Sequence, residues 1–225
     1  MSGILYGVGV GPGDPELMTL KAVRLIQENE IIACPGTMPT ETTAYRIASQ
    51  AVPELAEKTL LPVAMPMVMD REKMRENHEK AADQMEPYLQ QGENIVFLTL
   101  GDPAIYSTFY YIQEILAKRG YTTELVSGIP SFCAAAARVN LPLAKWNEPL
   151  HILPAVHGAE LAFDQPGTYV LMKCGSKLQQ LKEVLRESGR SVILVENCGM
   201  AGEKIFRGID EIPDHTGYYS LMIVK

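Results

Sequence analysis

Short runs of branched apolar residues alternate along the chain with longer segments in which apolar residues recur every three or four positions. The short runs predict strands at residues 4–10, 30–34, 58–61, 94–100, 121–126, 151–153, 169–172, 192–195 and 218–224. The longer segments predict helices at residues 17–27, 42–52, 70–91, 106–118, 131–139 and 176–187. Repeated strand–helix–strand order is typical of an α/β protein with largely parallel or mixed sheets.

The number of predicted strands is large for one open sheet in a chain of 225 residues. We therefore expect two α/β domains, an N-terminal one over residues 1–119 and a C-terminal one over residues 120–225. In such folds a ligand binds at the carboxyl ends of the strands, and here we expect a cleft between the domains.

The longest predicted helix carries a stripe of Met74, His78, Ala81, Met85 and Tyr88. The stripe would serve either as core packing or as a hydrophobic, cofactor-facing groove, and its spacing favours core packing. For His78 we expect a packed, hydrogen-bonded side chain rather than a ligand. Pro87 is expected to kink the helix or break it in two.

The composition indicates a globular protein and argues against some classes of function. Apolar residues make up 47% of the chain, which is typical of a globular protein, and 20 Lys and Arg against 27 Asp and Glu give a net charge of −7. The acidic balance argues against a general nucleic-acid binder. No apolar run approaches the ~20 residues that span a bilayer, and the first residues predict a strand rather than a signal peptide.

The cysteines and histidines show no metal-binding spacing, so we expect no metal site. The four cysteines, which are far apart in the sequence, are Cys34, Cys133, Cys174 and Cys198. They predict reduced thiols in a cytoplasmic protein.

A glycine-rich loop follows the first predicted strand, at residues 7–17. It does not match the dinucleotide fingerprint G-x-G-x-x-G, because the sixth position is Pro12 when counted from Gly7 and Asp14 when counted from Gly9. Asp14 would also repel a pyrophosphate. The loop therefore serves either as a tight turn, with Asp14 capping the next helix, or as a close approach to another ligand.

Two further loops follow predicted strands. Residues 100–108 read L-G-D-P-A-I-Y-S-T, and their Asp102 would either bind a ligand or cap the next helix. Residues 126–132 read V-S-G-I-P-S-F. Three such loops at strand ends indicate a binding site more strongly than any one of them alone.

The three loops resemble those of the tetrapyrrole (corrin and porphyrin) methylases. Residues 9–22 match the family block G-x-G-P-G-D-P-E-L-x-T-L-K-A, and the loops at residues 101–103 and 128–132 follow at the family's spacing. The resemblance covers the whole chain. It implies two α/β domains in the tetrapyrrole methylase fold, S-adenosylmethionine as methyl donor, a tetrapyrrole substrate and a homodimer.

Within the family, residues 5–11 and 101–108 are most similar to the members that methylate carbon 20 of precorrin-2 or cobalt-factor II in cobalamin synthesis. Uroporphyrinogen III methyltransferases usually carry F-G-R-G-x-E-E after their G-D-P loop, whereas residues 106–110 here read Y-S-T-F-Y. The alternatives are another tetrapyrrole methylase, acting on uroporphyrinogen III or precorrin-4, and a non-catalytic tetrapyrrole carrier or sensor. A nicotinamide oxidoreductase is disfavoured by the broken fingerprint.

The resemblance also implies site residues. The cofactor would be bound by Gly101, Asp102, Ile105, Tyr106, Ser131, Phe132, Lys173, Cys174, Ser220 and Leu221. The substrate would be bound by Pro12, Gly13 and Asp14. Ordinary packing is an equal alternative for Cys174 and Leu221, and no catalytic base is assigned.

Candidate partners for the substrate carboxylates are Lys21, Arg71, Arg75, Arg138, Lys145 and Lys173, each of which would otherwise be a solvated surface charge. The apolar residues Met65, Met67, Val68 and Met69 favour a dimer, because such a stretch is seldom left exposed.

Overall fold

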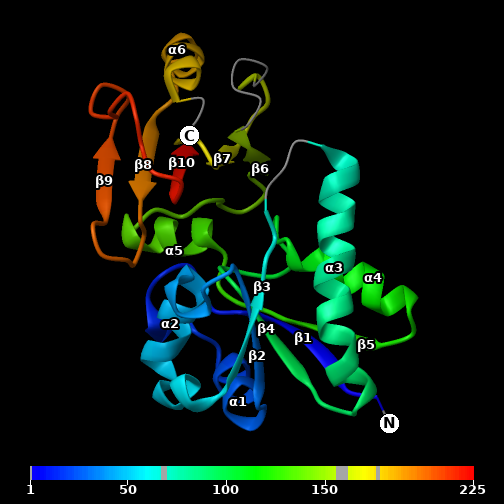
Figure 1. Cartoon of the computed structure of the whole chain (residues 1–225). Helices are drawn as coiled ribbons and strands as arrows, with labels where there is room; N and C mark the ends of the chain where they lie inside the picture. The colour runs from blue at the N-terminus through cyan, green and yellow to red at the C-terminus, as the bar shows by residue number, and fades with distance from the viewer. Residues whose placement is uncertain (1, 67–69, 156–161, 176–177) are drawn as a thin grey trace. The chain divides into compact units, whose positions relative to one another are not determined.

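In the computed structural model the chain folds as two compact units, Met1–Pro130 and Ser131–Lys225 (Figure 1). The structure describes residues 2–66, 70–155, 162–175 and 178–225. Each unit is built on its own five-stranded sheet. The α/β fold class with two sheets therefore agrees with the expectation from the sequence.

The first unit is a parallel sheet with helices on both faces. Its strands are β1 (Ile4–Gly9), β2 (Ile31–Pro35), β3 (Thr59–Val63), β4 (Ile95–Thr99) and β5 (Thr122–Val126). Its helices are α1 (Leu20–Glu28), α2 (Thr43–Ala51), α3 (Arg71–Gln90) and α4 (Phe109–Lys118). The strand order is β3-β2-β4-β1-β5, and every pair is parallel.

Alternate residues of the strands enter two separate cores. Val96 and Leu98 of β4 pack with α1 and α2, whereas Ile95 and Phe97 pack with α3 and α4. Figure 1 shows the two helix pairs on opposite sides of the sheet. All five residues of β4 are buried, which accounts for its continuous apolar sequence.

The core interpretation of the apolar stripe on α3 is confirmed for Ala81 and Met85, which are buried against the sheet. The helix runs unbroken through Pro87, contrary to a break at that residue. Pro87 lies in the last turn, so only one backbone hydrogen bond near the helix end is lost.

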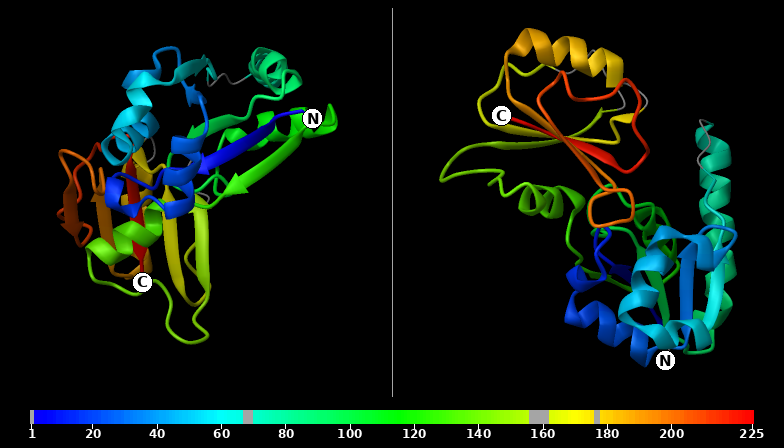
Figure 2. Two further views of the ribbon diagram at one scale, coloured as in Figure 1. Left: turned by 90° about the horizontal axis from the view of Figure 1, so that it is seen from below. Right: turned by 90° about the vertical axis from the view of Figure 1, so that its left-hand side faces the viewer.

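The second unit has a mixed sheet. Its strands are β6 (Leu150–Pro154), β7 (Thr168–Met172), β8 (Val192–Glu196), β9 (Lys204–Arg207) and β10 (Ser220–Val224). Its helices are α5 (Ser131–Arg138) and α6 (Leu178–Ser188), which lie on opposite sides of the sheet (Figure 2). The order is β6-β7-β10-β8-β9, with only β6 and β7 parallel.

Two differences from the prediction concern one strand and the division between the units. Strand β9 was not predicted, because its four residues, K-I-F-R, include only two apolar ones. We expected the division between domains at 119/120, whereas β5 pairs in parallel with β1 and the first unit continues to Pro130. Gly120, with a φ of +91°, ends helix α4 rather than the unit.

Among the described residues, no helix is both long enough and apolar enough to cross a membrane.

Candidate functional site

Three loops leave the carboxyl ends of β4, β1 and β5, which are neighbours in the first sheet. Because these strands are parallel, the loops emerge at the same edge. The first two are joined by a pair of backbone hydrogen bonds, from Gly101 N to Gly11 O at 2.8 Å and from Gly11 N to Gly101 O at 3.3 Å. The three loops that the sequence places after strands therefore lie at one edge of the first sheet.

Glycines allow the three loops to pack backbone against backbone. A Cβ atom on Gly9 would lie 2.5 Å from Gly101 O and 2.7 Å from Gly128 N. A Cβ atom on Gly128 would lie 2.1 Å from Gly101 O. These distances are well inside van der Waals contact, so a side chain at either position would push the loops apart. The glycines that fail the dinucleotide spacing therefore serve a close approach between loops.

Asp102 links two of the loops through its carboxylate. Oδ1 accepts a hydrogen bond from Ala104 N at 2.8 Å, and Oδ2 accepts one from Gly128 N at 3.0 Å. The first bond is a local turn contact of the kind expected of a capping residue. The second crosses to the loop after β5, and neither sequence interpretation of Asp102 anticipated it.

Tyr106 lies further along the same loop in a left-handed backbone conformation, with a φ of +49°. For a residue with a side chain this conformation costs about 1–2 kcal/mol, and it is found most often where the surroundings fix a binding loop. Its side chain is 48% exposed. The next residue, Ser107, bonds to Thr99 and accepts from Phe109 N, so α4 begins at Phe109 rather than at residue 106.

The predicted substrate residues lie in the loop after β1. Pro12 and Gly13 are buried, and Asp14 is partly exposed. Asp14 Oδ1 accepts from Glu16 N at 2.9 Å and caps a short 3-10 helix, Pro15–Leu17. The predicted cap is confirmed, although the α-helix itself begins later, at Leu20 behind its own cap Thr19.

In the second unit, the predicted cofactor residues gather at one end of β7 and β10. Leu221 pairs with Met172, which places Ser220 beside the chain that leaves β7 through Lys173 and Cys174. Lys173 has a φ of +62° and so turns the chain sharply there. Ser131 and Phe132 begin α5 in this same unit.

Cys174 is fully buried, and its Sγ donates to Leu171 O at 3.0 Å. Burial raises the pKa of this thiol to about 12, which keeps it protonated at neutral pH. Cys174 is therefore not a nucleophile, and packing accounts for its side chain.

Sequence reasoning missed Glu196, the last residue of β8. Glu196 pairs with Ser220 across the sheet, is 9% exposed, and accepts a hydrogen bond from Gly217 N at 2.5 Å. Ser220 Oγ donates to Gly217 O at 2.9 Å. The turn before β10 is thus fixed by both residues. The sequence shows only that Glu196 follows a predicted strand, and neither its burial nor its partner can be read from it.

The candidate basic residues divide into two groups. Lys21 forms an ion pair with Glu124, and Arg138 forms one with Glu203 at 2.6 Å. The second group has no ion pair with any residue that the structure describes and consists of Arg71, Arg75, Lys145 and Lys173.

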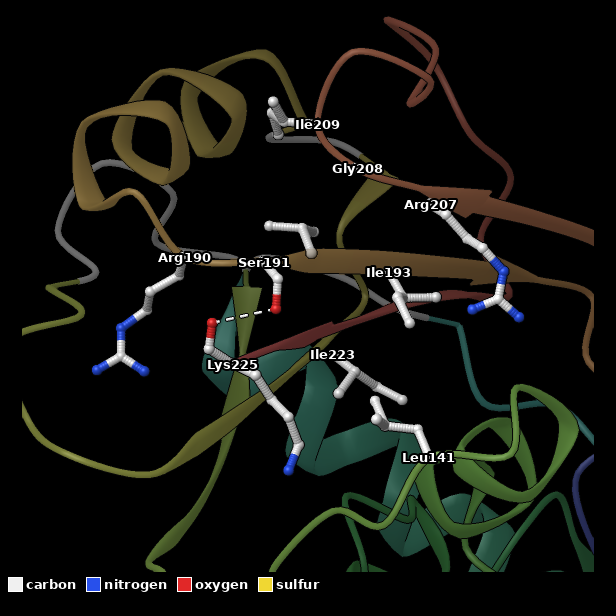
Figure 3. Close-up of a pocket in the computed structure, with 10 residues that line it drawn as sticks. Leu141, Arg190, Ser191, Ile193, Arg207, Gly208, Ile209, Ile223 and Lys225 are labelled. Atoms are coloured by element: carbon white, nitrogen blue, oxygen red, sulfur yellow. Dashed lines mark hydrogen bonds between the residues drawn. The ribbon is translucent and has the colours of Figure 1, made fainter.

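A cavity of about 270 Å³ opens in the second unit, at the opposite end of β8 and β10 from Glu196 and Ser220. Leu141, Ile193 and Ile223 meet in it (Figure 3). Arg190 at its margin donates to three backbone carbonyls, those of Phe163, Gln165 and Gly167. These bonds hold the loop before β7 in place. None of the residues that line the cavity is a predicted cofactor residue.

Within the described ranges, no three His, Cys, Asp or Glu residues are grouped in a way that could hold a metal ion.

Comparison with known proteins gives a family match over residues 4–211, to the tetrapyrrole (corrin/porphyrin) methylases. A relative in Methanocaldococcus jannaschii, named "Probable cobalt-precorrin-2 C(20)-methyltransferase", is 33% identical over 98% of this chain and 95% of its own length. The cobalt-precorrin-2 C(20)-methyltransferase of Salmonella typhimurium is 27% identical over 100% of this chain and 97% of its own.

Solved structures show the same fold. A uroporphyrin-III C-methyltransferase from Thermus thermophilus has a TM-score of 0.74 at 24% identity, covering 100% of this chain and 92% of its own. A structure of a Thermus thermophilus uroporphyrin-III C-methyltransferase complexed with S-adenyl homocysteine has a TM-score of 0.70 at 21% identity, covering 99% and 97%.

The substitution Asp102→Ala tests the link between loops. It leaves Ala104 N and Gly128 N without their acceptor, so the free energy of unfolding should fall by roughly 1–3 kcal/mol. Urea unfolding measures the loss. Asp14→Ala is the matched control, because it removes a carboxylate with one local backbone bond and should cost about 1 kcal/mol or less. Equal losses in the two variants would show that the bond to Gly128 contributes nothing.

Proposed function

The chain belongs to the tetrapyrrole methylase family, and we propose that it transfers a methyl group from S-adenosylmethionine to carbon 20 of precorrin-2 or cobalt-factor II in cobalamin biosynthesis. The proposal is carried by similarity along almost the whole chain to an archaeal relative named for that carbon atom. The sequence Y-S-T-F-Y at residues 106–110, in place of F-G-R-G-x-E-E, supports it against the uroporphyrinogen III reaction.

We assign the cofactor to ten residues, for which the geometry of each unit offers support. In the first unit they are Gly101, Asp102, Ile105 and Tyr106, and in the second they are Ser131, Phe132, Lys173, Cys174, Ser220 and Leu221. The first group lies on a loop that carries the exposed ring of Tyr106, which suits a ligand with a positive charge. The second group includes residues fixed at one sheet end by Glu196 and Gly217.

S-adenosylmethionine supplies an electrophilic methyl group on a positively charged sulfur atom. The electron-rich tetrapyrrole carbon is the nucleophile, so no covalent bond to the enzyme is needed. The chain's own task is to bind, to align and to exclude water. Pro12, Gly13 and Asp14 are assigned to the substrate. Bound water or a substrate carboxylate can accept the proton that leaves the methylated carbon.

A homodimer in the cytoplasm is also part of the proposal. The four cysteines are free thiols in the structure, which is compatible with a reducing compartment. The apolar stretch beginning at Met65 supports a dimer, although residues 67–69 of it lie outside the described residues. Neither a nucleic acid nor a membrane is included among the partners.

Product analysis tests the position of methylation. With carbon-13-labelled S-adenosylmethionine and precorrin-2 or cobalt-factor II, NMR should show one new methyl group on the bridge carbon between rings A and D. Running both substrates in parallel determines whether cobalt must already be present. A labelled methyl at carbon 2, 7, 11 or 17 would assign the chain to another reaction of the family. Tight tetrapyrrole binding without methyl transfer would indicate a carrier or sensor.

Tyr106→Ala tests the cofactor assignment. Loss of the ring should weaken binding of S-adenosylhomocysteine or S-adenosylmethionine by about 0.5–2 kcal/mol, the range for an aromatic ring beside a cation, with the larger loss for the sulfonium compound. Calorimetry measures both affinities. Tyr110→Ala is the control. Tyr110 is another exposed tyrosine, and it is the second residue of α4, outside the Gly-Asp-Pro loop. Equal affinities in wild type and Tyr106→Ala would remove Tyr106 from the site.

Light scattering tests the oligomeric state. The chain has a mass of 24.8 kDa, so a homodimer should scatter as a particle of twice that mass at micromolar concentration. A particle of monomer mass would contradict the dimer and leave the catalytic proposal intact.

A further inference from the structure

A groove between α3 and α4 in the first unit forms an open cavity of about 390 Å³. Its lining residues from α3 are Arg71, Met74, Arg75, His78 and Glu79. Those from α4 and the residue after it are Tyr111, Glu114, Ile115, Lys118 and Arg119. None of them belongs to the loops assigned to the cofactor or the substrate.

The acidic residues of the groove are already engaged. Arg119 binds three carboxylates of α3, those of Glu79 at 2.6 Å, Glu86 at 2.7 Å and Asp83 at 2.8 Å. Lys118 pairs with Glu114 at 3.1 Å. Arg119 and Lys118 are therefore largely neutralised by their neighbours.

Unlike Lys118 and Arg119, the other two arginines of the groove, Arg71 and Arg75, keep their charge unpaired among the described residues. They lie one helical turn apart on the groove side of α3, both are exposed, and neither forms an ion pair within the described ranges. Two guanidinium groups at this spacing offer forked donors to carboxylate oxygens.

His78 adds a buried polar group to the same cavity. The residue is only 7% exposed, and its ring stacks on Tyr111 with centroids 4.5 Å apart. No hydrogen bond joins either ring nitrogen to a residue that the structure describes, which differs from the hydrogen-bonded side chain we expected. Burial lowers the pKa of His78, so at neutral pH the ring is neutral and keeps one N–H donor. The ring nitrogens are reached by solvent from the cavity, since none of the described residues has a buried side-chain nitrogen or oxygen atom without a partner.

We propose that this groove binds a carboxylate-rich anion, with Arg71 and Arg75 as its charged donors and His78 as a donor from within the cavity. The anion has two chemical sources. One is the set of side-chain carboxylates of a tetrapyrrole, which rests on the proposed function. The other is a separate small polycarboxylate, which does not depend on methyl transfer.

Two probes, citrate and the polycarboxylated porphyrin uroporphyrin, are titrated into the full chain by calorimetry in the absence of S-adenosylmethionine. The test variant is Arg71→Gln with Arg75→Gln. The matched control is Lys73→Gln with Lys80→Gln, which removes the same charge from exposed positions on the same helix that do not line the cavity. A third variant, His78→Phe, keeps a ring beside Tyr111 and removes the donor.

We expect the arginine variant to bind at least one probe more weakly by roughly tenfold or more, and the lysine control to bind it nearly as wild type does. His78→Phe should also weaken binding while its urea unfolding midpoint stays close to that of wild type. Weakened uroporphyrin binding identifies tetrapyrrole side chains as the source. Weakened citrate binding with uroporphyrin unaffected identifies a separate polycarboxylate.

Three results would overturn the inference. The first is that wild type binds neither probe, as it would if a second copy of the chain covers the groove. The second is that the arginine variant binds both probes as wild type does. The third is equal weakening in the arginine and lysine variants. That result would show that the loss of binding follows the net charge of the protein and not the two arginines of the groove. Because no methyl donor is present, failure here leaves the carbon-20 reaction untouched, and failure of that reaction leaves citrate binding interpretable.

Discussion

Backbone packing among Gly9, Gly101 and Gly128 is the constraint on which the proposed site depends. A Cβ atom on Gly9 or Gly128 would lie 2.1–2.9 Å from backbone atoms of the other loops, so these loops can meet only without side chains. Asp102 then bonds to Gly128 N and holds the junction closed. Together these contacts fix the start of the loop that carries Ile105 and Tyr106. The positions of the cofactor candidates in the first unit therefore depend on this glycine packing and on the bond between Asp102 and Gly128.

This arrangement has an energetic cost that is offset locally. Glycines lose more backbone entropy on folding than other residues, and the left-handed conformation of Tyr106 adds strain. The strand pairing of β1 with β4 and β5, and the backbone bonds between Gly11 and Gly101, oppose that cost. A rigid loop is useful for methyl transfer, because an alignment error of about 1 Å can cost roughly 100-fold in rate.

The sequence predicted the features that depend on local pattern. The apolar run of β4, the strand-end loops and the Asp14 cap all follow from neighbouring residues. Features that depend on distant pairing were not predictable in the same way. β5 was assigned to the second domain because its parallel partner, β1, is remote in sequence. The bond from Gly128 to Asp102 and the stack of His78 on Tyr111 likewise require the folded arrangement of separate elements.

Both units use a carboxylate in the same way. Asp102, in the loop after β4, accepts from the backbone N–H of Gly128, and Glu196, at the end of β8, accepts from that of Gly217. In each case the acceptor follows or ends a buried strand, and the donor is a glycine in a neighbouring loop. A carboxylate held in this way positions the backbone of the neighbouring loop. This agrees with a reaction in which the substrate carbon is the nucleophile, since the protein then contributes alignment rather than an acid–base pair.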